Sequence, residues 1–357
     1  MEENKQHKTA LPETEPIPSA QAPEALLDIR GLRVEYHTDE DVVYAVNGLD
    51  LTIGKGESLG LVGETGAGKT TTALSVLRLI ADPPGKIMGG EIWFEGEDML
   101  QAKPARLREI RGSKISVIFQ DPMTSLNPVY SVGDQIAEVI HQHEKCSKEE
   151  GRRKAGDMLE MVGIPRARYD EYPHQFSGGM KQRVVIAMSI ACSPELILAD
   201  EPTTALDVTI QAQVLELMNE LKEKLRTSLL LITHDLGVVA QVCDRVAIMY
   251  AGEIVESGTI AEVFDHPHHP YTIGLFGSIP SLDETAEKLK PIRGQMPDPT
   301  ELPEGCAFAP RCPYATGACR TRKPEMTGVG GTQMVRCLAH QGVFESPELM
   351  EEVRHGR

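Results

Sequence analysis

The sequence has few aromatic residues, fewer cations than anions and no long apolar run, and each shortage excludes something. Aromatic residues make up 4% of the 357 residues. The chain has 36 Lys and Arg and 53 Asp and Glu, which gives a formal net charge of −17. This acidic balance argues against general affinity for nucleic acid, which needs a basic surface, so no nucleic-acid partner is predicted. No run approaches eighteen apolar residues, so no membrane-spanning helix is predicted. The start of the chain lacks the apolar core of a signal peptide, so we expect a cytosolic protein that contacts a membrane through a partner.

The hydrophobic fraction of 41% is sufficient for one large or two ordinary domains. Residues 1–26 contain four prolines and little apolar sequence, so we expect a disordered tail there. Apolar stretches at 26–36, 45–53, 56–63, 115–120, 196–200 and 229–233 are typical of strands, and helical sequence follows several of them. The pattern predicts an α/β fold with a mostly parallel core sheet over residues 27–258, with a helical insert at about 121–195. Residues 259–357, rich in Pro, His and Cys, are expected to form a separate, loop-rich extension.

The clearest chemical motif is Gly63-Glu-Thr-Gly-Ala-Gly-Lys-Thr70, which fits the phosphate-loop pattern between a buried strand and a helix. Glycines let successive backbone N–H groups point at one anion, and the helix that follows adds its positive end. Lys69 would supply charge to the β- and γ-phosphates, and Thr70 a hydroxyl to Mg²⁺. The motif predicts ATP and Mg²⁺ as cofactors.

Two further motifs complete the predicted chemistry. The strand 196–200 ends in the adjacent carboxylates Asp200 and Glu201, which alternation along an extended chain points in different directions. Asp200 can then hold Mg²⁺ while Glu201 polarises a water. Ser177 is a good helix N-cap, and Gly178 and Gly179 leave N–H groups bare, which predicts a second anion-binding helix start. Two anion-binding helix starts in one chain are explained if two chains share each nucleotide, one through its phosphate loop and the other through its Ser-Gly-Gly helix start.

With these motifs in order, residues 27–258 resemble the ATP-binding subunits of ABC transporters. The resemblance implies an antiparallel β subdomain beside the core sheet, and roles for residues that the spacing alone does not assign. Gln120 resembles the Q-loop glutamine, Phe176-Ser-Gly-Gly-Met180 the signature motif, Ala205-Leu206-Asp207 the D-loop and His234 the switch histidine. Phe176 and Met180 depart from the usual Leu and Gln of the signature but leave its Ser-Gly-Gly core intact. Tyr36 stands where the family stacks an aromatic ring on adenine, with Tyr44 as an alternative.

The candidate site is therefore a set of residues from all of these motifs. The catalytic candidates are Glu201, His234, Lys69 and Gln120, and the Mg²⁺ candidates are Thr70, Gln120 and Asp200. The nucleotide-binding candidates are Tyr36, Gly63, Glu64, Thr65, Gly66, Ala67, Gly68, Lys69, Thr70, Thr71, Gln120, Ser177, Gly178, Gly179, Asp200 and Asp207.

Longer strings, including residues 120–136 and the segment Asp265-His-Pro-His-His-Pro-Tyr-Thr272, resemble the oligopeptide/dipeptide importer ATPases, a group with relatives for nickel and glutathione. The resemblance implies an ATP-hydrolysing subunit that drives peptide import from the cytoplasmic face of the membrane. Its expected partners are a second, similar ATPase in a heterodimer, two transmembrane permease subunits and an extracytoplasmic substrate-binding protein. The alternatives are nickel or glutathione import, or an ABC-type ATPase that moves no solute.

Cys306, Cys312, Cys319 and Cys337 cluster in the extension, and four thiolates can bind either Zn²⁺ or a [4Fe–4S] cluster. Their spacing lacks the close Cys pairs of most zinc sites. The resemblance implies these four cysteines as ligands of a structural [4Fe–4S] cluster, with zinc or free thiols as alternatives. The histidines of residues 266–271 are interpreted as a rigid connector rather than a metal site.

Overall fold

The structure, a computed structural model, describes residues 25–204, 206–278 and 291–355. Its centre is an eight-stranded sheet in the order β11-β12-β10-β9-β3-β8-β7-β6. The five strands from β9 to β6 are mutually parallel, and β10, β12 and β11 continue the sheet in antiparallel fashion. The strands are β3 (Ser58–Val62), β6 (Ile115–Ile118), β7 (Leu196–Asp200), β8 (Ser228–Thr233), β9 (Arg245–Tyr250), β10 (Glu253–Thr259), β11 (Thr327–Gly330) and β12 (Gln333–Val335). The predicted α/β fold with a parallel core is confirmed.

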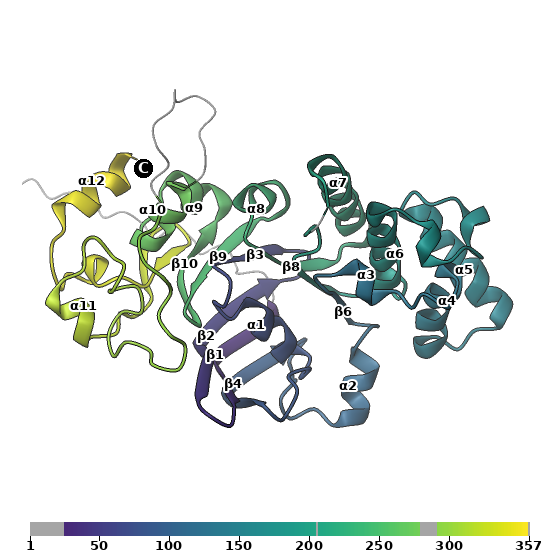
Figure 1. Ribbon diagram of the computed structural model, residues 1–357, viewed down its shortest axis with the longest axis horizontal. Helices are drawn as coiled ribbons and strands as arrows, with labels where there is room; N and C mark the ends of the chain where they lie inside the picture. Colours follow the sequence, from purple (N-terminus) through teal and green to yellow (C-terminus); the bar gives the residue numbers. More distant parts are fainter. Residues whose placement is uncertain (1–24, 205, 279–290, 356–357) are drawn as a thin grey trace, which may run out of the picture.

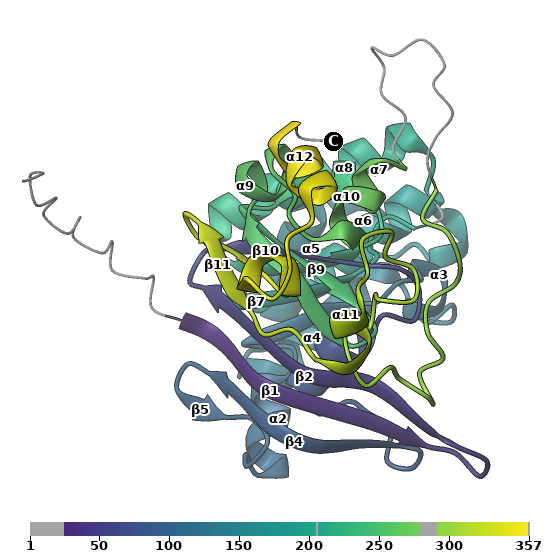
Figure 2. The same ribbon diagram turned by 90° about the vertical axis from the view of Figure 1, so that its left-hand side faces the viewer.

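A second sheet of four antiparallel strands lies beside the first, in the order β2-β1-β4-β5 (Figures 1 and 2). These strands are β1 (Ala25–His37), β2 (Val42–Gly54), β4 (Gly85–Phe94) and β5 (Glu97–Asp98). Buried aliphatic side chains alternate along β1, and they pack with those of β3 and the first helix in one apolar cluster. The two sheets thus enclose a common core.

Further helices pack against the two sheets. They are α1 (Lys69–Val76), α2 (Pro104–Ile110), α7 (Val208–Leu225) and α8 (Leu236–Val242). In the described parts of the chain, no helix has the length and apolar character that crossing a bilayer requires.

The chain between β6 and β7 is helical, as predicted. It contains α3 (Pro122–Ser125), α4 (Val132–His143), α5 (Lys148–Met161) and α6 (Gly178–Ile190), with short 3-10 turns at Arg166–Arg168 and Pro173–Gln175. Serines at 131, 147 and 177 cap α4, α5 and α6 by accepting hydrogen bonds from backbone N–H groups three residues ahead. We call residues 122–190 the helical part.

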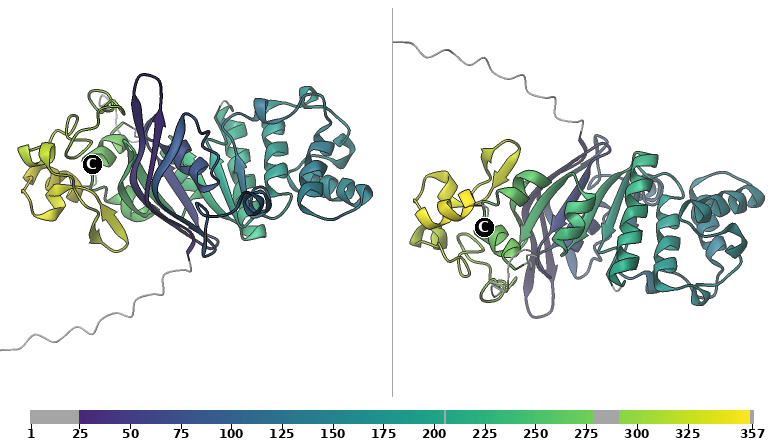
Figure 3. Two further views of the ribbon diagram at one scale, coloured as in Figure 1. Left: turned by 90° about the horizontal axis from the view of Figure 1, so that it is seen from below. Right: turned by 90° about the horizontal axis from the view of Figure 1, so that it is seen from above.

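The extension lies at the opposite end of the molecule from the helical part (Figures 1 and 3). It contains α9 (Ile260–Asp265), α10 (Pro270–Phe276), α11 (Gly317–Thr321), α12 (Pro347–His355) and a 3-10 turn at Leu338–Gln341. Its strands β11 and β12 extend the main sheet through β10. The sequence did not predict that the extension would share the main sheet.

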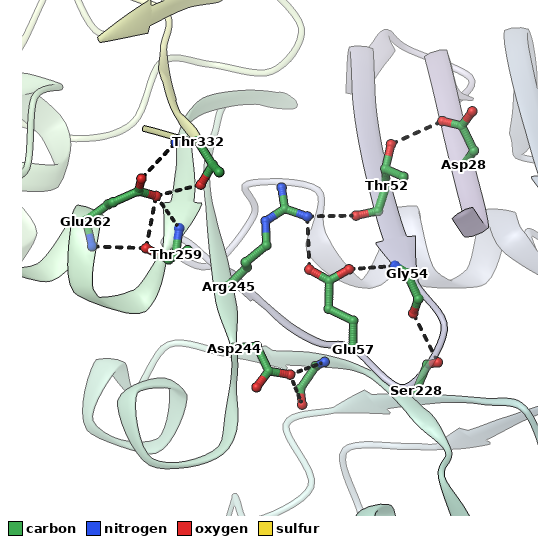
Figure 4. Close-up of polar contacts among 11 residues, drawn as sticks. Asp28, Thr52, Gly54, Glu57, Ser228, Asp244, Arg245, Thr259, Glu262 and Thr332 are labelled. Atoms are coloured by element: carbon green, nitrogen blue, oxygen red, sulfur yellow. Dashed lines mark hydrogen bonds and ion pairs between the residues drawn. The ribbon is translucent and has the colours of Figure 1, made fainter. Parts of the chain in front are cut away.

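Two carboxylates bind residues of the extension, Glu256 from β10 and Glu262 from α9 within the extension itself. Glu256 is fully buried and accepts hydrogen bonds from the backbone N–H groups of His268 and His269 and from Nε2 of Gln333, at 2.7 to 2.9 Å. Glu262 accepts from the backbone and hydroxyl of both Thr259 and Thr332 (Figure 4). Each carboxylate therefore links the chain before residue 272 to the hairpin that returns near residue 333.

Candidate nucleotide site

The phosphate loop connects β3, whose five residues are all buried, to α1. Glycine is required at both ends of the loop. A Cβ atom at Gly63 would lie 2.2 Å from the carbonyl oxygen of Met249, and one at Gly68 would lie 2.3 Å from that of Ala45. Gly68 also has φ of +103°, a conformation that favours glycine. The backbone of the loop therefore packs too closely against β9 and β2 for any other residue at these two positions.

Lys69 is buried at the start of α1, with 6% of its surface exposed. Its Nζ donates hydrogen bonds to the carbonyl oxygens of Gly63 at 2.8 Å and Glu64 at 3.0 Å. Burial lowers the pKa of Lys69, while the negative charges of Glu201, Asp200 and Glu64 act in the opposite direction. The ammonium group is thus held inside the loop where a phosphate chain would lie.

Asp200 ends β7 beside α1 and is 7% exposed. Burial raises the pKa of Asp200, and a hydrogen bond with Thr70 partly offsets this. A carboxylate and a hydroxyl brought together are the hard oxygen ligands that Mg²⁺ prefers. The predicted pair Thr70 and Asp200 therefore fits a magnesium ion.

The carboxylate of Glu201 contacts two other predicted catalytic residues, Gln120 and His234. Its Oε2 accepts hydrogen bonds from Nε2 of Gln120 at 3.0 Å and from the hydroxyl of Thr204 at 2.9 Å. Its Oε1 lies 3.2 Å from Nδ1 of His234. Although burial raises the pKa of Glu201, hydrogen bonds from Thr204 and His234 and the charges of His234 and Lys69 lower it below the usual value. Sequence reasoning missed Thr204, which only its contact identifies.

The backbone of Glu201 explains why the two neighbouring carboxylates face different partners. Glu201 has φ of +46°, in the left-handed region that non-glycine residues rarely adopt. Its N–H still bonds to the carbonyl oxygen of Ile232, so the turn comes directly after the strand pairing. Such strained conformations concentrate at functional sites.

The signature segment caps α6 as predicted but lies apart from the phosphate loop. The hydroxyl of Ser177 accepts from the N–H of Met180 at 3.4 Å. Gly179 packs against Ile210, where a Cβ atom would come within 2.3 Å of a methyl group. Within the described residues, no hydrogen bond joins residues 177–179 to residues 63–71.

Both departures from the usual signature contact one arginine that the sequence did not single out. The guanidinium carbon of Arg168 lies 4.2 Å from the centre of the Phe176 ring, and Nη1 lies 3.3 Å from the sulfur of Met180. Arg168 also pairs with Glu171 and donates to the carbonyl oxygen of Gln175. Phe176 and Met180 are therefore packed residues of the helical part.

The other predicted residues are placed as follows. The hydroxyl of Tyr36 lies 3.2 Å from that of Thr71, so this ring is beside the loop. Tyr44, the alternative, is 38% exposed, and its N–H bonds to the carbonyl oxygen of Pro299. Asp207 caps α7 by accepting from the N–H of Ile210 at 3.0 Å. Ala205 of the predicted D-loop lies outside the described residues.

The extension contributes residues to the loop that sequence reasoning missed. The hydroxyl of Tyr271 accepts from the N–H of Glu64 at 3.1 Å. Nη1 of Arg311 donates to both carboxylate oxygens of Glu64 at 3.0 and 3.1 Å. The methyl group of Met296 lies 3.1 Å from where a Cβ atom of Gly66 would be. Tyr271 and Arg311 lie 207 and 247 positions from Glu64, so no local pattern identifies them.

The prediction of a [4Fe–4S] cluster on Cys306, Cys312, Cys319 and Cys337 is wrong. In the part of the chain that the structure describes, no three or more His, Cys, Asp or Glu side chains are grouped so as to hold a metal ion, and all four cysteines are free. They line an apolar pocket with Phe308, Leu338 and Phe344. Burial raises the pKa of Cys306, and that of Cys312 and Cys337 to about 12, so these thiols keep their protons. They pack as small apolar residues.

Two family models match separate parts of the chain. Residues 46–204 match the family described as ABC transporter, and residues 255–319 match that described as oligopeptide/dipeptide transporter, C-terminal region. The second match covers α9, α10 and the segment with Arg311.

Curated relatives are similar over nearly the whole chain. The oligopeptide transport ATP-binding protein AppD of Bacillus subtilis is 49% identical over 318 residues, which is 88% of this chain and 97% of that protein. OppD of the same organism, also an oligopeptide transport ATP-binding protein, is 51% identical over 91% of this chain and 93% of its own length. The dipeptide transport ATP-binding protein DppD of B. subtilis is 48% identical over 88% of this chain and 94% of its own length.

Solved structures with this fold include ABC cassettes. A dimeric, post-hydrolysis structure of the cassette MJ0796 bound to ADP and Pi matches with a TM-score of 0.59 and 28% identity, over 66% of this chain and 98% of that one. CbiO1 from Clostridium perfringens, part of the ABC transporter complex cbiONQ, matches with a TM-score of 0.58 and 27% identity over 67% of this chain and 90% of that one.

Proposed function

Since this chain belongs to the oligopeptide/dipeptide transporter family of ABC ATP-binding proteins, we propose that it hydrolyses ATP to drive peptide import across the cytoplasmic membrane. The observation that carries the proposal is the span of the likeness. Relatives named for peptide transport match about nine-tenths of the chain, so the similarity includes the extension as well as the cassette.

The proposed division of the chain follows the sequence: a tail of residues 1–26, a cassette of residues 27–258 and an extension of residues 259–357. In the cassette, the backbone of residues 63–68 and the ammonium group of Lys69 hold the β- and γ-phosphates, with Thr71 beside them. Tyr36 stacks on the adenine ring. Thr70, Asp200 and Gln120 hold Mg²⁺, which would neutralise charge developing on the transferred phosphoryl group.

Hydrolysis then depends on the carboxylate of Glu201. Its hydrogen bonds to Gln120, Thr204 and His234 fix its direction, and its lowered pKa keeps it charged at neutral pH. Glu201 polarises the attacking water, and His234 orients it and senses the γ-phosphate. A carboxylate at this position supports hydrolysis at this chain's own site.

A second ATPase completes the site in our proposal. The start of α6 at residues 177–179 makes no hydrogen bond to the loop of its own chain among the residues described. Its bare N–H groups would instead close over the γ-phosphate held by a partner, a similar but separate ATPase in a heterodimer. Leu206 lies beside the start of α6, 3.7 Å from where a Cβ atom of Gly178 would be, and the neighbouring Asp207 would also face the nucleotide at the junction with the partner.

The remaining partners would be two permeases and a substrate-binding protein on the outer side, with this chain peripheral on the cytoplasmic face. Three exposed apolar side chains support permease docking near Gln120. Phe119 is 48% exposed, Val129 71% and Tyr130 55%. Exposed apolar groups gathered in one short segment are typical of protein contact sites. Closure of the two ATPases around ATP would then be transmitted to the permeases through this segment.

The test purifies the tagged chain from gently solubilised native membranes and identifies the proteins that accompany it by mass spectrometry. We expect two multi-spanning proteins and a second ATPase, and uptake of labelled peptide should stop in cells lacking this chain. If cells lacking this chain lose uptake of nickel or glutathione but keep uptake of peptide, the proposal that the chain serves peptide import is wrong. Recovery with other soluble proteins and no permease would reject the transport proposal.

A further inference from the structure

Glu64, the second residue of the phosphate loop, is the point where the extension meets the proposed ATP site. Each of its polar groups has a separate partner. The N–H donates to the hydroxyl of Tyr271, the carboxylate pairs with Arg311, and the carbonyl oxygen accepts from Nζ of Lys69 at 3.0 Å. One residue thus connects two side chains of the extension with the lysine of the loop.

Arg311 is built into this position. Its side chain is 6% exposed, and Nε donates to the carbonyl oxygen of Arg293 at 3.1 Å. Nη1 lies 3.4 Å from the hydroxyl of Tyr250, and the guanidinium carbon lies about 6 Å from the rings of Tyr250 and Phe308. A guanidinium group with so many fixed contacts loses little freedom by pairing with Glu64, unlike an exposed lysine.

We propose that Arg311 and Tyr271 are positioning residues through which the extension sets the shape and charge of the phosphate loop. Neither touches the nucleotide. Tyr271 holds the Gly63–Glu64 peptide, whose carbonyl oxygen, that of Gly63, accepts from Nζ of Lys69 at 2.8 Å. Arg311 neutralises the Glu64 carboxylate beside the place where the polyphosphate binds. The inference rests on the proposed ATP site and gives the extension a part in ATP affinity.

The expected direction follows from charge. The Glu64 carboxylate is close enough for its charge to act on Lys69. Without Arg311 that carboxylate is unneutralised, and it repels the phosphate chain and competes for the ammonium group. Residues that act on a site through a neighbour change affinities by about 0.5–2 kcal/mol, or roughly twofold to thirtyfold.

The experiment titrates full-length protein with a fluorescent ATP analogue and measures kcat and KM for ATP. We expect Arg311→Met to weaken binding and raise KM by about tenfold, with kcat changed less than about threefold. Arg311→Lys, which keeps the charge, should recover much of the loss. The double variant Glu64→Gln/Arg311→Met should bind ATP more tightly than Arg311→Met, because the carboxylate that lost its partner is no longer charged.

Lys323→Met is the matched control. Lys323 also belongs to the extension and pairs with a cassette carboxylate, Glu253, at 3.3 Å, but it is 59% exposed and its partner is on β10 rather than the loop. It should leave KM unchanged. If Arg311→Met does not fold, Tyr271→Phe removes only the hydroxyl that accepts from Glu64 and should also raise KM, by a few fold.

The proposal is overturned if Arg311→Met and Tyr271→Phe both bind ATP like the wild type, or if adding Glu64→Gln restores nothing to Arg311→Met. The second outcome would mean that Arg311 only stabilises the fold and does not act through the charge of Glu64. Lys69→Ala separates this failure from that of the ATP site itself. A wild type that binds ATP through Lys69, with a silent Arg311, refutes only the inference, whereas a wild type indifferent to Lys69→Ala refutes the site.

Discussion

The helical part and the extension lie at opposite ends of the molecule and relate to the phosphate loop in different ways (Figure 3). The extension reaches the loop of its own chain through Tyr271, Met296 and Arg311. The helical part carries the start of α6, which in the described residues forms no hydrogen bond to that loop. In our proposals one end supports ATP binding in its own chain, and the other serves the site of a second chain. The predictions below separate these two contributions.

The largest effect is expected at Glu201, which belongs to neither end. Glu201→Gln keeps the size and the hydrogen-bonding capacity of the side chain but removes the charge that polarises water. We expect turnover to fall by about 10²–10⁴-fold while ATP binding persists. Steady-state ATPase assays and ATP-analogue titrations measure the two quantities. Equal loss of both would contradict the assigned role.

The next largest effect tests the helical part alone. A Cβ atom at Gly178 would lie 3.7 Å from Leu206, an ordinary contact, so Gly178→Asp fits within the chain. Its carboxylate would face the γ-phosphate held by the partner. We expect ATPase activity of the assembled transporter to fall about a hundredfold.

ATP affinity of the isolated Gly178→Asp chain should stay within about twofold of the wild type. Arg311→Met gives the opposite pattern, because it weakens binding in the isolated chain. If Gly178→Asp also weakened binding in the isolated chain, the helical part would act on its own loop and the comparison would fail.

A smaller effect concerns the bonds within the extension between α9 and the hairpin at residue 332. Although burial raises the pKa of Glu262, hydrogen bonds from Thr332 and Thr259 lower it to about 2, below the model-peptide value of 4.5. Because the folded pKa is depressed, the stabilisation is present above pH 4.5 and is lost as the pH falls towards 2.

Glu262→Gln should therefore lower the free energy of unfolding by about 2 kcal/mol at pH 7 and by less at pH 3.5. Urea titrations at both pH values measure the difference. A loss that does not depend on pH would show that the charge of Glu262 contributes nothing to the stability of the extension.

The sequence predicted the residues whose function depends on local spacing. Residues 63–70 and 177–179 form the loop and the helix cap that their patterns indicate, because each needs only its own short segment. The structure also brings Gln120, Glu201 and His234 together at the edge of the parallel sheet. Contacts between distant segments were not predictable in this way. Arg311 and Glu64 are 247 positions apart, and no local pattern connects them.

Spacing also misled where side-chain direction decides the outcome. The four cysteines of the extension are close in sequence, yet they line an apolar pocket and are not grouped as a metal site. The pairing of β11 and β12 with the main sheet has no clear sequence signal, because these strands are four and three residues long and β11 has glycine at alternate positions. In the segment 266–271, the backbone N–H groups of His268 and His269 donate to the buried Glu256.

The smallest expected effect separates packing from chemistry in the helical part. Arg168→Ala removes the contacts with Phe176 and Met180 and should destabilise the protein by about 1 kcal/mol. Phe176 precedes the Ser-Gly-Gly core and Met180 follows it, so losing both contacts should make the start of α6 less well ordered. ATPase activity of the assembled transporter should then fall by a few fold, while ATP affinity of the isolated chain stays the same. Arg153→Ala, which removes an ion pair between side chains 61% and 39% exposed, is the matched control and should change neither quantity. Urea unfolding and ATPase assays of both variants decide the matter, and equal behaviour of the two would show that Arg168 does not support the signature segment.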